Sequence, residues 1–297
     1  MSIDSSSDSP FWLSWCDGQS VSDPQRSLSA ASPAALFGES AFETMRVDQG
    51  EVLYLEDHLD RLTTTALALG LAEEIDRSLI QSEIKNALEE IGVDRAGRLR
   101  ITLMRAIDTA SGLNVERCHI QRWLLYSPLL NVADEPVEIC FSTVRKIPPA
   151  CFDPAWKHGN YLSSLLAVRE ARARGFGDAI LLSTEGFVTE SSCANLFWIR
   201  DRELWTCSSD SVFPGLCRKR VLEVAEEMSI VVHSGHYQPE ELLLADELFL
   251  SSSIRGLVAI SRLEGRDYDL GFPDSLTAQL GVALKKRDQA ELIRRVL

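Results

Sequence analysis

Residues 137–199 constrain the fold most, because they alternate strand and helix patterns over their whole length. The strand-like segment VEICFSTVR is followed by a helical pattern over residues 160–174. Two more strand-like segments, AILLS and ANLFWI, then flank a turn at residues 184–186. This alternation predicts an α/β domain, in which helices pack on the faces of a sheet.

The first part of the chain carries a different pattern. Strand-like segments and a hairpin turn at residues 48–50 come first, and the amphipathic helices EDHLDRLTTTALALGL and DRSLIQSEIKNALEEIG follow. Two further strand-like segments, GRLRITLMRA and CHIQRWLLYSPL, precede the polar connection SPLLNVADEPVE. We therefore predict a disordered tail over residues 1–10, an N-terminal α+β domain over residues 11–130 and a C-terminal α/β domain over residues 131–297.

Charge and composition argue against several classes of protein. The formal net charge of −14 disfavours a nucleic-acid or membrane-surface protein, because both need a basic surface. No apolar run reaches the ~18 residues of a membrane span, and the first ten residues lack the basic and apolar regions of a signal peptide. The seven cysteines are irregularly spaced, so neither a disulfide framework nor a metal site is expected. We expect a cytoplasmic chain with reduced thiols.

Two residues of the central stretch could meet over one ligand. Lys157 stands just before an apolar helix, where partial desolvation would lower the pKa of its ammonium and free the amine to attack a carbonyl group. Glu190 precedes SSCAN, whose small side chains would let a planar ligand approach the backbone. A buried carboxylate requires a cation, and a protonated pyridine nitrogen would supply one. For either residue alone, a solvated surface position is the alternative.

Three segments could bind a phosphate group. In FPGLCRKR a proline-glycine pair precedes a helix, so the first backbone amides lie at the positive end of the helix dipole. LFLSSSIRG offers hydroxyls after a strand, and the guanidinium in EDHLDRL also suits phosphate. The donors are the amides of Leu216 and Cys217, the hydroxyls of Ser251, Ser252 and Ser253, and the side chain of Arg61. With an amine and an acid, these donors are the groups that pyridoxal phosphate requires, although each alone could be a cap, a turn or an exposed arginine.

The order of these segments resembles a known family. FGESAFETMRV, LEDHLDRL, KHGNYL, EGFVTESSCANLFW, FPGLCRKRV and ADELFLSSS look like the motifs of fold-type IV pyridoxal-phosphate enzymes. These include branched-chain aminotransferases, D-amino-acid aminotransferases and aminodeoxychorismate lyase, and the resemblance extends from about Phe37 to about Gly265. It implies a two-domain α/β (α+β) architecture like that of D-amino-acid aminotransferase, with a cofactor-binding C-terminal domain, an active site between the domains and a homodimer.

The resemblance also implies roles for individual residues. Lys157 matches the lysine that binds the cofactor covalently and acts as the catalytic base, and Glu190 matches the partner of the pyridine nitrogen. Tyr161 falls where branched-chain enzymes place a tyrosine near the ring hydroxyl. The residues that match the phosphate contacts are Arg61, Leu216, Cys217, Ser252 and Ser253. The candidates for binding an amino-acid-like substrate are Phe42, Thr44 and Arg105, in segments 37–46 and 105–114.

Members of this family differ in the reaction that they catalyse. A transaminase passes an amino group to a 2-oxo acid, whereas the lyase converts 4-amino-4-deoxychorismate to para-aminobenzoate and pyruvate in folate biosynthesis. The spacing of KHGN and the segments CANLFW and FETMR resemble the lyase, while Tyr161 resembles the branched-chain enzymes and AIDTASGLN lacks a pattern common in lyases. The sequence therefore predicts the lyase. A class IV aminotransferase is the alternative, and a non-catalytic cofactor-binding protein is a remote one.

Overall fold

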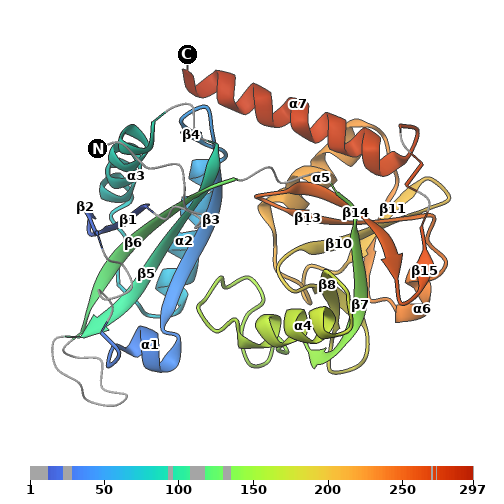
Figure 1. The fold of residues 1–297 in the computed structure, drawn as a ribbon, viewed down its shortest axis with the longest axis horizontal. Helices are drawn as coiled ribbons and strands as arrows, with labels where there is room; N and C mark the ends of the chain where they lie inside the picture. Colours follow the sequence, from blue (N-terminus) through green and yellow to red (C-terminus); the bar gives the residue numbers. More distant parts are fainter. Residues whose placement is uncertain are drawn as a thin grey trace. The chain divides into compact units, whose positions relative to one another are not determined.

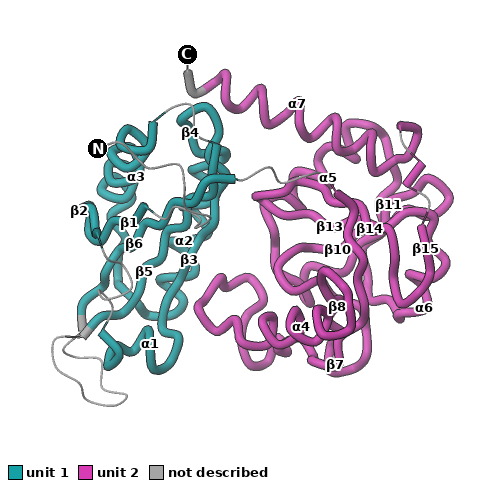
Figure 2. The backbone as a smooth tube through the Cα atoms, viewed as in Figure 1, with its two compact units in different colours: residues 1–131 teal, residues 132–297 magenta. Residues whose placement is uncertain are grey.

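The computed structural model (Figure 1) describes residues 13–22, 29–92, 96–107, 118–129, 135–268, 270–271 and 273–296. The chain divides into two compact units, residues 1–131 and 132–297, each with its own sheet and core (Figure 2). The predicted tail over residues 1–10 and the segment 108–114 lie outside the described residues.

An antiparallel sheet in the order β2-β1-β6-β5-β3-β4 forms the centre of the first unit. Its strands are β1 (Leu13–Cys16), β2 (Gln19–Ser20), β3 (Ser40–Asp48), β4 (Glu51–Val52), β5 (Gly97–Ile107) and β6 (Cys118–Pro128), and its helices are α1 (Pro33–Phe37), α2 (Leu55–Ala68) and α3 (Arg77–Ile91). Alternate residues of β3, including Met45 and Val47, join Leu59 of α2 and Ile84 of α3 in one core. The predicted amphipathic helices therefore bury their apolar faces against this sheet.

A nine-stranded sheet forms the centre of the second unit, in the order β12-β11-β10-β13-β14-β7-β8-β9 with β15 beside β14. Its strands are β7 (Val137–Arg145), β8 (Asp178–Leu182), β9 (Val188–Ser191), β10 (Asn195–Arg200), β11 (Glu203–Cys207), β12 (Val232–Gly235), β13 (Glu247–Ser252), β14 (Gly256–Leu263) and β15 (Arg266–Asp267). Its helices are α4 (Leu162–Ala173), α5 (Leu216–Glu227), α6 (Pro239–Leu242) and α7 (Leu276–Val296).

Two strand-helix-strand crossovers organise the second unit. Helix α4 joins the parallel strands β7 and β8, and it lies over them because Ala167 and Ala171 allow close packing against Ala179 and Leu181 (Figure 1). Helix α5 joins the parallel strands β11 and β12. The mixed α/β architecture predicted from the sequence is confirmed.

Several details differ from the sequence-based expectation. The turn at residues 184–186 joins β8 to β9, and β10 begins only after a second turn closed by Ser191 N–H and Ala194 O. Strands β11 and β14 were not predicted, and β14 pairs with the distant β7, Ile260 opposite Val137.

Two general expectations concern thiols and membranes. The six cysteines whose side chains the structure describes are free. None of the helices in the described part of the chain is both long and apolar enough to cross a membrane.

Candidate active site

Lys157 lies in the loop that leads from β7 into α4 and is only half-buried. Its Nζ donates to Tyr161 Oη at 3.3 Å and lies 4.5 Å from the centre of the Phe213 ring. Tyr161 is the N-cap residue of α4, but its side chain makes no capping hydrogen bond and turns toward the lysine instead. The amine of Lys157 is thus placed between two aromatic side chains.

A neutral histidine lies next to this lysine. His158 is buried, and its Nδ1 accepts a hydrogen bond from the backbone N–H of Asn160 at 3.1 Å. Burial lowers the pKa of the imidazole, and the positive charges of Lys146 and Lys157 lower it further. The charges of two lysine side chains therefore act on one buried imidazole ring.

Glu190, in β9, is only 5% exposed. Its Oε2 accepts hydrogen bonds from Asn195 Nδ2 at 2.9 Å and from the backbone N–H of Phe213 at 3.1 Å. Its Oε1 forms an ion pair with Lys146 Nζ. The ring of Phe213 contacts Lys157 and its N–H binds Glu190, so the predicted lysine and glutamate share one contact residue.

Helix α5 begins at the same loop. Gly215 is its N-cap residue and provides no capping side chain, so the first-turn amides of Leu216 and Cys217 lie at an uncapped helix start. Burial raises the pKa of the Cys217 thiol to about 12, and the hydroxyl of Ser251 and the backbone N–H of Ser252 lie beside its sulfur. The start of α5 and the end of β13, two of the three segments suggested for phosphate, are therefore adjacent.

The two candidate serines lie at the hairpin between β13 and β14. Ser252 ends β13, and its Oγ accepts a hydrogen bond from the backbone N–H of Arg255 at 3.3 Å. Ser253 follows in the turn and is partly exposed. Gly256 closes this turn with φ +64°, a conformation that favours glycine.

Arg61, the third phosphate candidate, belongs to the first unit and faces a buried acid. Its Nε and Nη2 donate to the two carboxylate oxygens of Glu43 at 2.7 and 2.8 Å. His58 Nδ1 pairs with the same carboxylate at 2.7 Å. Burial alone would raise the pKa of the Glu43 carboxyl, but the hydrogen bonds from Arg61 and His58 outweigh it and lower this pKa from 4.5 to about 2.

We expect this cluster to make the protein acid-sensitive. As the pH falls, the carboxyl of Glu43 takes up a proton near pH 4.5 in the unfolded chain but only near pH 2 in the folded protein. The free energy of unfolding should therefore fall by roughly 3 kcal/mol between about pH 4.5 and about pH 2. Denaturant unfolding across this range should show a weaker pH dependence in Glu43→Gln than in the wild type. Glu89→Gln, an exposed change on α3, should keep the wild-type slope. Equal slopes in all three proteins would contradict the assignment.

The substrate candidates are also in the first unit. Phe42 and Thr44 point away from the α2 side of β3, and the guanidinium of Arg100 lies 3.6 Å above the Phe42 ring. Arg105 is buried, and its Nε and Nη2 donate to Glu39 Oε1 at 2.6 Å and Gly70 O at 2.5 Å. These protein partners account for the position of Arg105 without a substrate.

Three residues at the candidate site were missed from the sequence. Lys146 reaches Glu190 across 44 residues of chain, and nothing in the strand end TVRK pointed to that partner. Asn195 and Phe213 stand within motifs quoted above, ESSCAN and FPGL, yet their contacts with Glu190 depend on how β9, β10 and the α5 loop fold together. The only available signal was that both motifs flank candidate residues.

Gly215 holds the start of α5 close to this network. A Cβ atom at this position would lie 2.1 Å from Asn195 Oδ1. Asn195 cannot retreat easily, because its Nδ2 binds both Glu190 and the carbonyl oxygen of Phe213. We therefore expect Gly215→Ala to lower the free energy of unfolding by about 1–3 kcal/mol, as measured by denaturant titration.

The matched control is Gly281→Ala within α7. A Cβ at Gly281 would meet nothing within 4 Å, so alanine should be neutral there or stabilise by up to about 1 kcal/mol. Equal effects of the two substitutions would show that the contact with Asn195 does not constrain Gly215.

Comparison with known proteins identifies the family of this chain. A model of the family "amino-transferase class IV" matches residues 40–263. Branched-chain-amino-acid aminotransferase-like protein 2 of Arabidopsis thaliana is 27% identical over 278 residues, which cover 92% of this chain and 50% of the plant protein. The chain thus spans about half the length of that relative.

Two solved structures are similar over nearly the whole chain. The branched-chain aminotransferase of the archaeon Thermoproteus uzoniensis, solved with norvaline, has a TM-score of 0.82 at 25% identity and covers 94% of this chain and 95% of its own. The T.th. branched-chain amino acid aminotransferase, complexed with N-(5'-phosphopyridoxyl)-L-glutamate, has a TM-score of 0.85 at 22% identity and covers 94% of both chains. The latter likeness concerns the fold alone.

The mixed α/β fold matches that of branched-chain aminotransferases of solved structure. The chain belongs to the class IV aminotransferase family, because the family model matches more than half of it.

Proposed function

We propose that this chain is an aminotransferase that moves the amino group of a branched-chain or other amino acid to a 2-oxo acid, with pyridoxal phosphate as cofactor. The observation that carries the proposal is the 3.3 Å contact between Lys157 Nζ and Tyr161 Oη, because a tyrosine at this position resembles the branched-chain enzymes. The relatives named above support this aminotransferase alternative over the lyase predicted from the sequence.

The residues of the second unit fit the cofactor. Bound pyridoxal phosphate would accept the electron pair left on the substrate's α-carbon when its C–H bond breaks. Lys157 would hold the aldehyde carbon, and the buried carboxylate of Glu190 would face the ring nitrogen. The uncapped amides of Leu216 and Cys217 would hold the phosphate together with the adjacent serines.

Lys157, Tyr161 and Phe213 would each have a separate role in the reaction. The amine of Lys157 would take the α-proton and later return it, a role that suits a half-buried primary amine. The phenol of Tyr161 orients that amine through their hydrogen bond. The ring of Phe213 covers one side of the amine, which limits the access of water.

Assays with separated substrates test the proposal. The purified protein should form glutamate and 4-methyl-2-oxopentanoate from leucine plus 2-oxoglutarate, and each substrate alone should give less than one turnover. The lyase interpretation predicts the opposite behaviour: pyruvate and para-aminobenzoate from 4-amino-4-deoxychorismate, with no 2-oxo acid needed. Multiple turnovers on aminodeoxychorismate alone, with no transfer from leucine, glutamate or D-alanine, would overturn the proposal.

A further inference from the structure

The two carboxylate oxygens of Glu190 are not equally occupied. Each oxygen can accept about two hydrogen bonds. Oε2 already accepts two, from Asn195 Nδ2 and Phe213 N–H. Oε1 accepts from Lys146 Nζ, its one hydrogen-bond partner among the described residues. A further donor or cation at this carboxylate must therefore approach Oε1, the oxygen that Lys146 uses.

The network around Oε2 is fixed, whereas Lys146 has room to move. Asn195 Nδ2 also donates to Phe213 O at 2.8 Å, so Asn195 and Phe213 hold Oε2 together. The backbone of Lys146 is held where its N–H donates to Leu182 O at 2.9 Å, and among the described residues its ammonium has no hydrogen-bond partner besides Glu190. Its side chain is 26% exposed, against 7% for that of Glu190. A flexible four-carbon stem therefore carries the ammonium into a buried site from a more exposed position.

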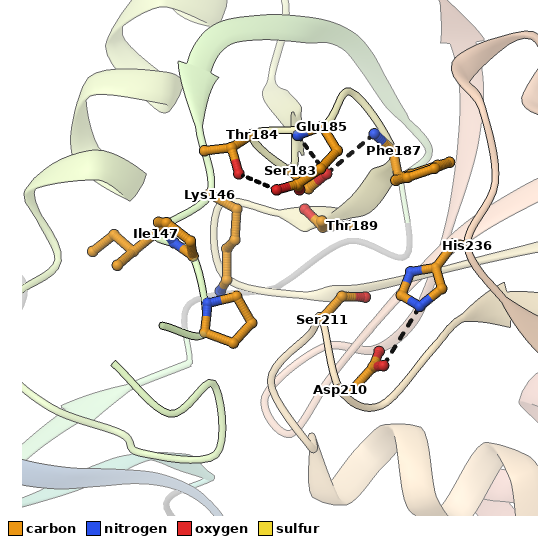
Figure 3. Close-up of a pocket in the computed structure, with 12 residues that line it drawn as sticks. Lys146, Ile147, Ser183, Thr184, Glu185, Phe187, Thr189, Asp210, Ser211 and His236 are labelled. Atoms are coloured by element: carbon orange, nitrogen blue, oxygen red, sulfur yellow. Dashed lines mark hydrogen bonds and ion pairs between the residues drawn. The ribbon is translucent and has the colours of Figure 1, made fainter. Parts of the chain in front are cut away.

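A cavity with both apolar and polar side chains in its lining adjoins this lysine. It has a volume of about 260 Å³ and is lined by Lys146 on one side and by Ser211 and the Asp210–His236 pair on another (Figure 3). Glu185, Ser183 and Thr184 also line it. The ammonium of Lys146 could turn into this cavity and find hydroxyl and carboxylate oxygens there.

The other buried cation nearby does not take the place of Lys146. The positive charge of Arg218 interacts with the negative charge of Glu190. Its guanidinium, however, forms its hydrogen bond elsewhere, from Nη2 to the backbone oxygen of Cys207 at 2.9 Å. Removing Lys146 would therefore leave Oε1 of a buried carboxylate without its direct cation, which is unfavourable.

We propose that Lys146 is a displaceable counterion of Glu190, an inference that rests on the proposed function. In the cofactor-free protein its ammonium neutralises the buried carboxylate. When a protonated ring nitrogen takes Oε1, the ammonium turns into the adjoining cavity, because two cations at one carboxylate oxygen repel each other. Lys146 thus stabilises the empty site and competes with the cofactor for Glu190.

This competition predicts effects of opposite sign. Without Lys146, the empty protein loses the partner of a buried charge and should unfold at a lower temperature. The same change removes the competitor of the ring nitrogen, so the affinity for pyridoxal phosphate should rise. If Lys146 served only in packing, its loss would lower both the melting temperature of the empty protein and its affinity for pyridoxal phosphate.

The test measures dissociation constants for two ligands by equilibrium dialysis in wild type and Lys146→Met. The ligands are pyridoxal phosphate and its 1-deaza analogue, in which a C–H group replaces the ring nitrogen. In the variant we expect about tenfold tighter binding of pyridoxal phosphate and unchanged or weaker binding of the analogue, which leaves Glu190 unpaired. The melting temperature of the cofactor-free variant should fall.

Three further variants separate charge from shape. Lys146→Arg keeps the cation and should behave like the wild type. Lys146→Gln removes the charge but keeps a polar end, and it serves as the uncharged variant if the methionine protein does not fold. Lys286→Met, an exposed change on α7, should alter nothing.

The outcomes distinguish this inference from the proposed function. If both ligands bind the uncharged variant more weakly by the same factor, or if neither affinity changes, Lys146 is not a displaceable counterion, while the proposed function stands. If the wild type binds no pyridoxal phosphate at all, the proposed function fails and the inference fails with it.

Discussion

Replacing Lys157 with alanine is expected to lower kcat by about 10⁴-fold, the largest effect that we predict for any single residue. The amine is the proposed acid-base group, and its placement against Tyr161 and Phe213 leaves no substitute at the same point among the described contacts. The measurement is transamination of leucine with 2-oxoglutarate, with circular dichroism as a check that the variant is folded. The variant should also lose the visible absorption of the loaded wild type.

Chemical labelling identifies the lysine directly. Borohydride reduction of the loaded wild type, followed by proteolysis and mass spectrometry, should place the added cofactor mass on Lys157. Lys146 is the informative comparison, because the charges of both lysines reach His158. Label on Lys146, or full activity in Lys157→Ala, would show that we have assigned the wrong amine.

Replacing Glu190 with glutamine is expected to lower kcat by about 10²- to 10³-fold while the phosphate-anchored cofactor stays bound. The neutral amide keeps the shape of the side chain but removes the charge that would hold a proton on the ring nitrogen. The rate of exchange of the substrate's α-hydrogen with deuterium from solvent should fall in parallel, because this step depends most on the ring as an electron acceptor.

A distant glutamate provides the control for this experiment. Glu226→Gln makes the same chemical change at an exposed position of α5 and should leave kcat near the wild-type value. If Glu190→Gln exchanged the α-hydrogen at the normal rate, the partner of the ring nitrogen would have to be another residue.

Local patterns predicted the parts of this structure that local interactions form. The helical patterns of α2, α3 and α4 were visible in the sequence because helical hydrogen bonds and helix faces repeat over a few residues. Strand β14 was not visible, because its place in the sheet depends on β7, far away in the chain. The split between β9 and β10 was missed because a short turn of small residues interrupts an otherwise continuous strand pattern.

The features of the candidate site also fall into two groups, those suggested by local sequence patterns and those that depend on the folded sheet. Lys157 and Glu190 became candidates because each stands at a recognisable boundary between a loop and a regular element. The ion pair of Glu190 with Lys146 and the burial of Arg61 against Glu43 could not be found, since each joins elements that meet only after the sheet has formed. Periodicity locates faces of elements, but it does not say which charged side chains face each other across them.

Asn195 has a consequence for how the second unit could be altered. Its amide nitrogen binds both Glu190 and the loop before α5, and its amide oxygen leaves no space for a side chain on the residue that starts this helix. The acid and the helix start are therefore coupled mechanically and cannot shift independently. The separation between Glu190 and the start of α5 is therefore fixed. A ligand that needs a different separation would require substitutions at both places together.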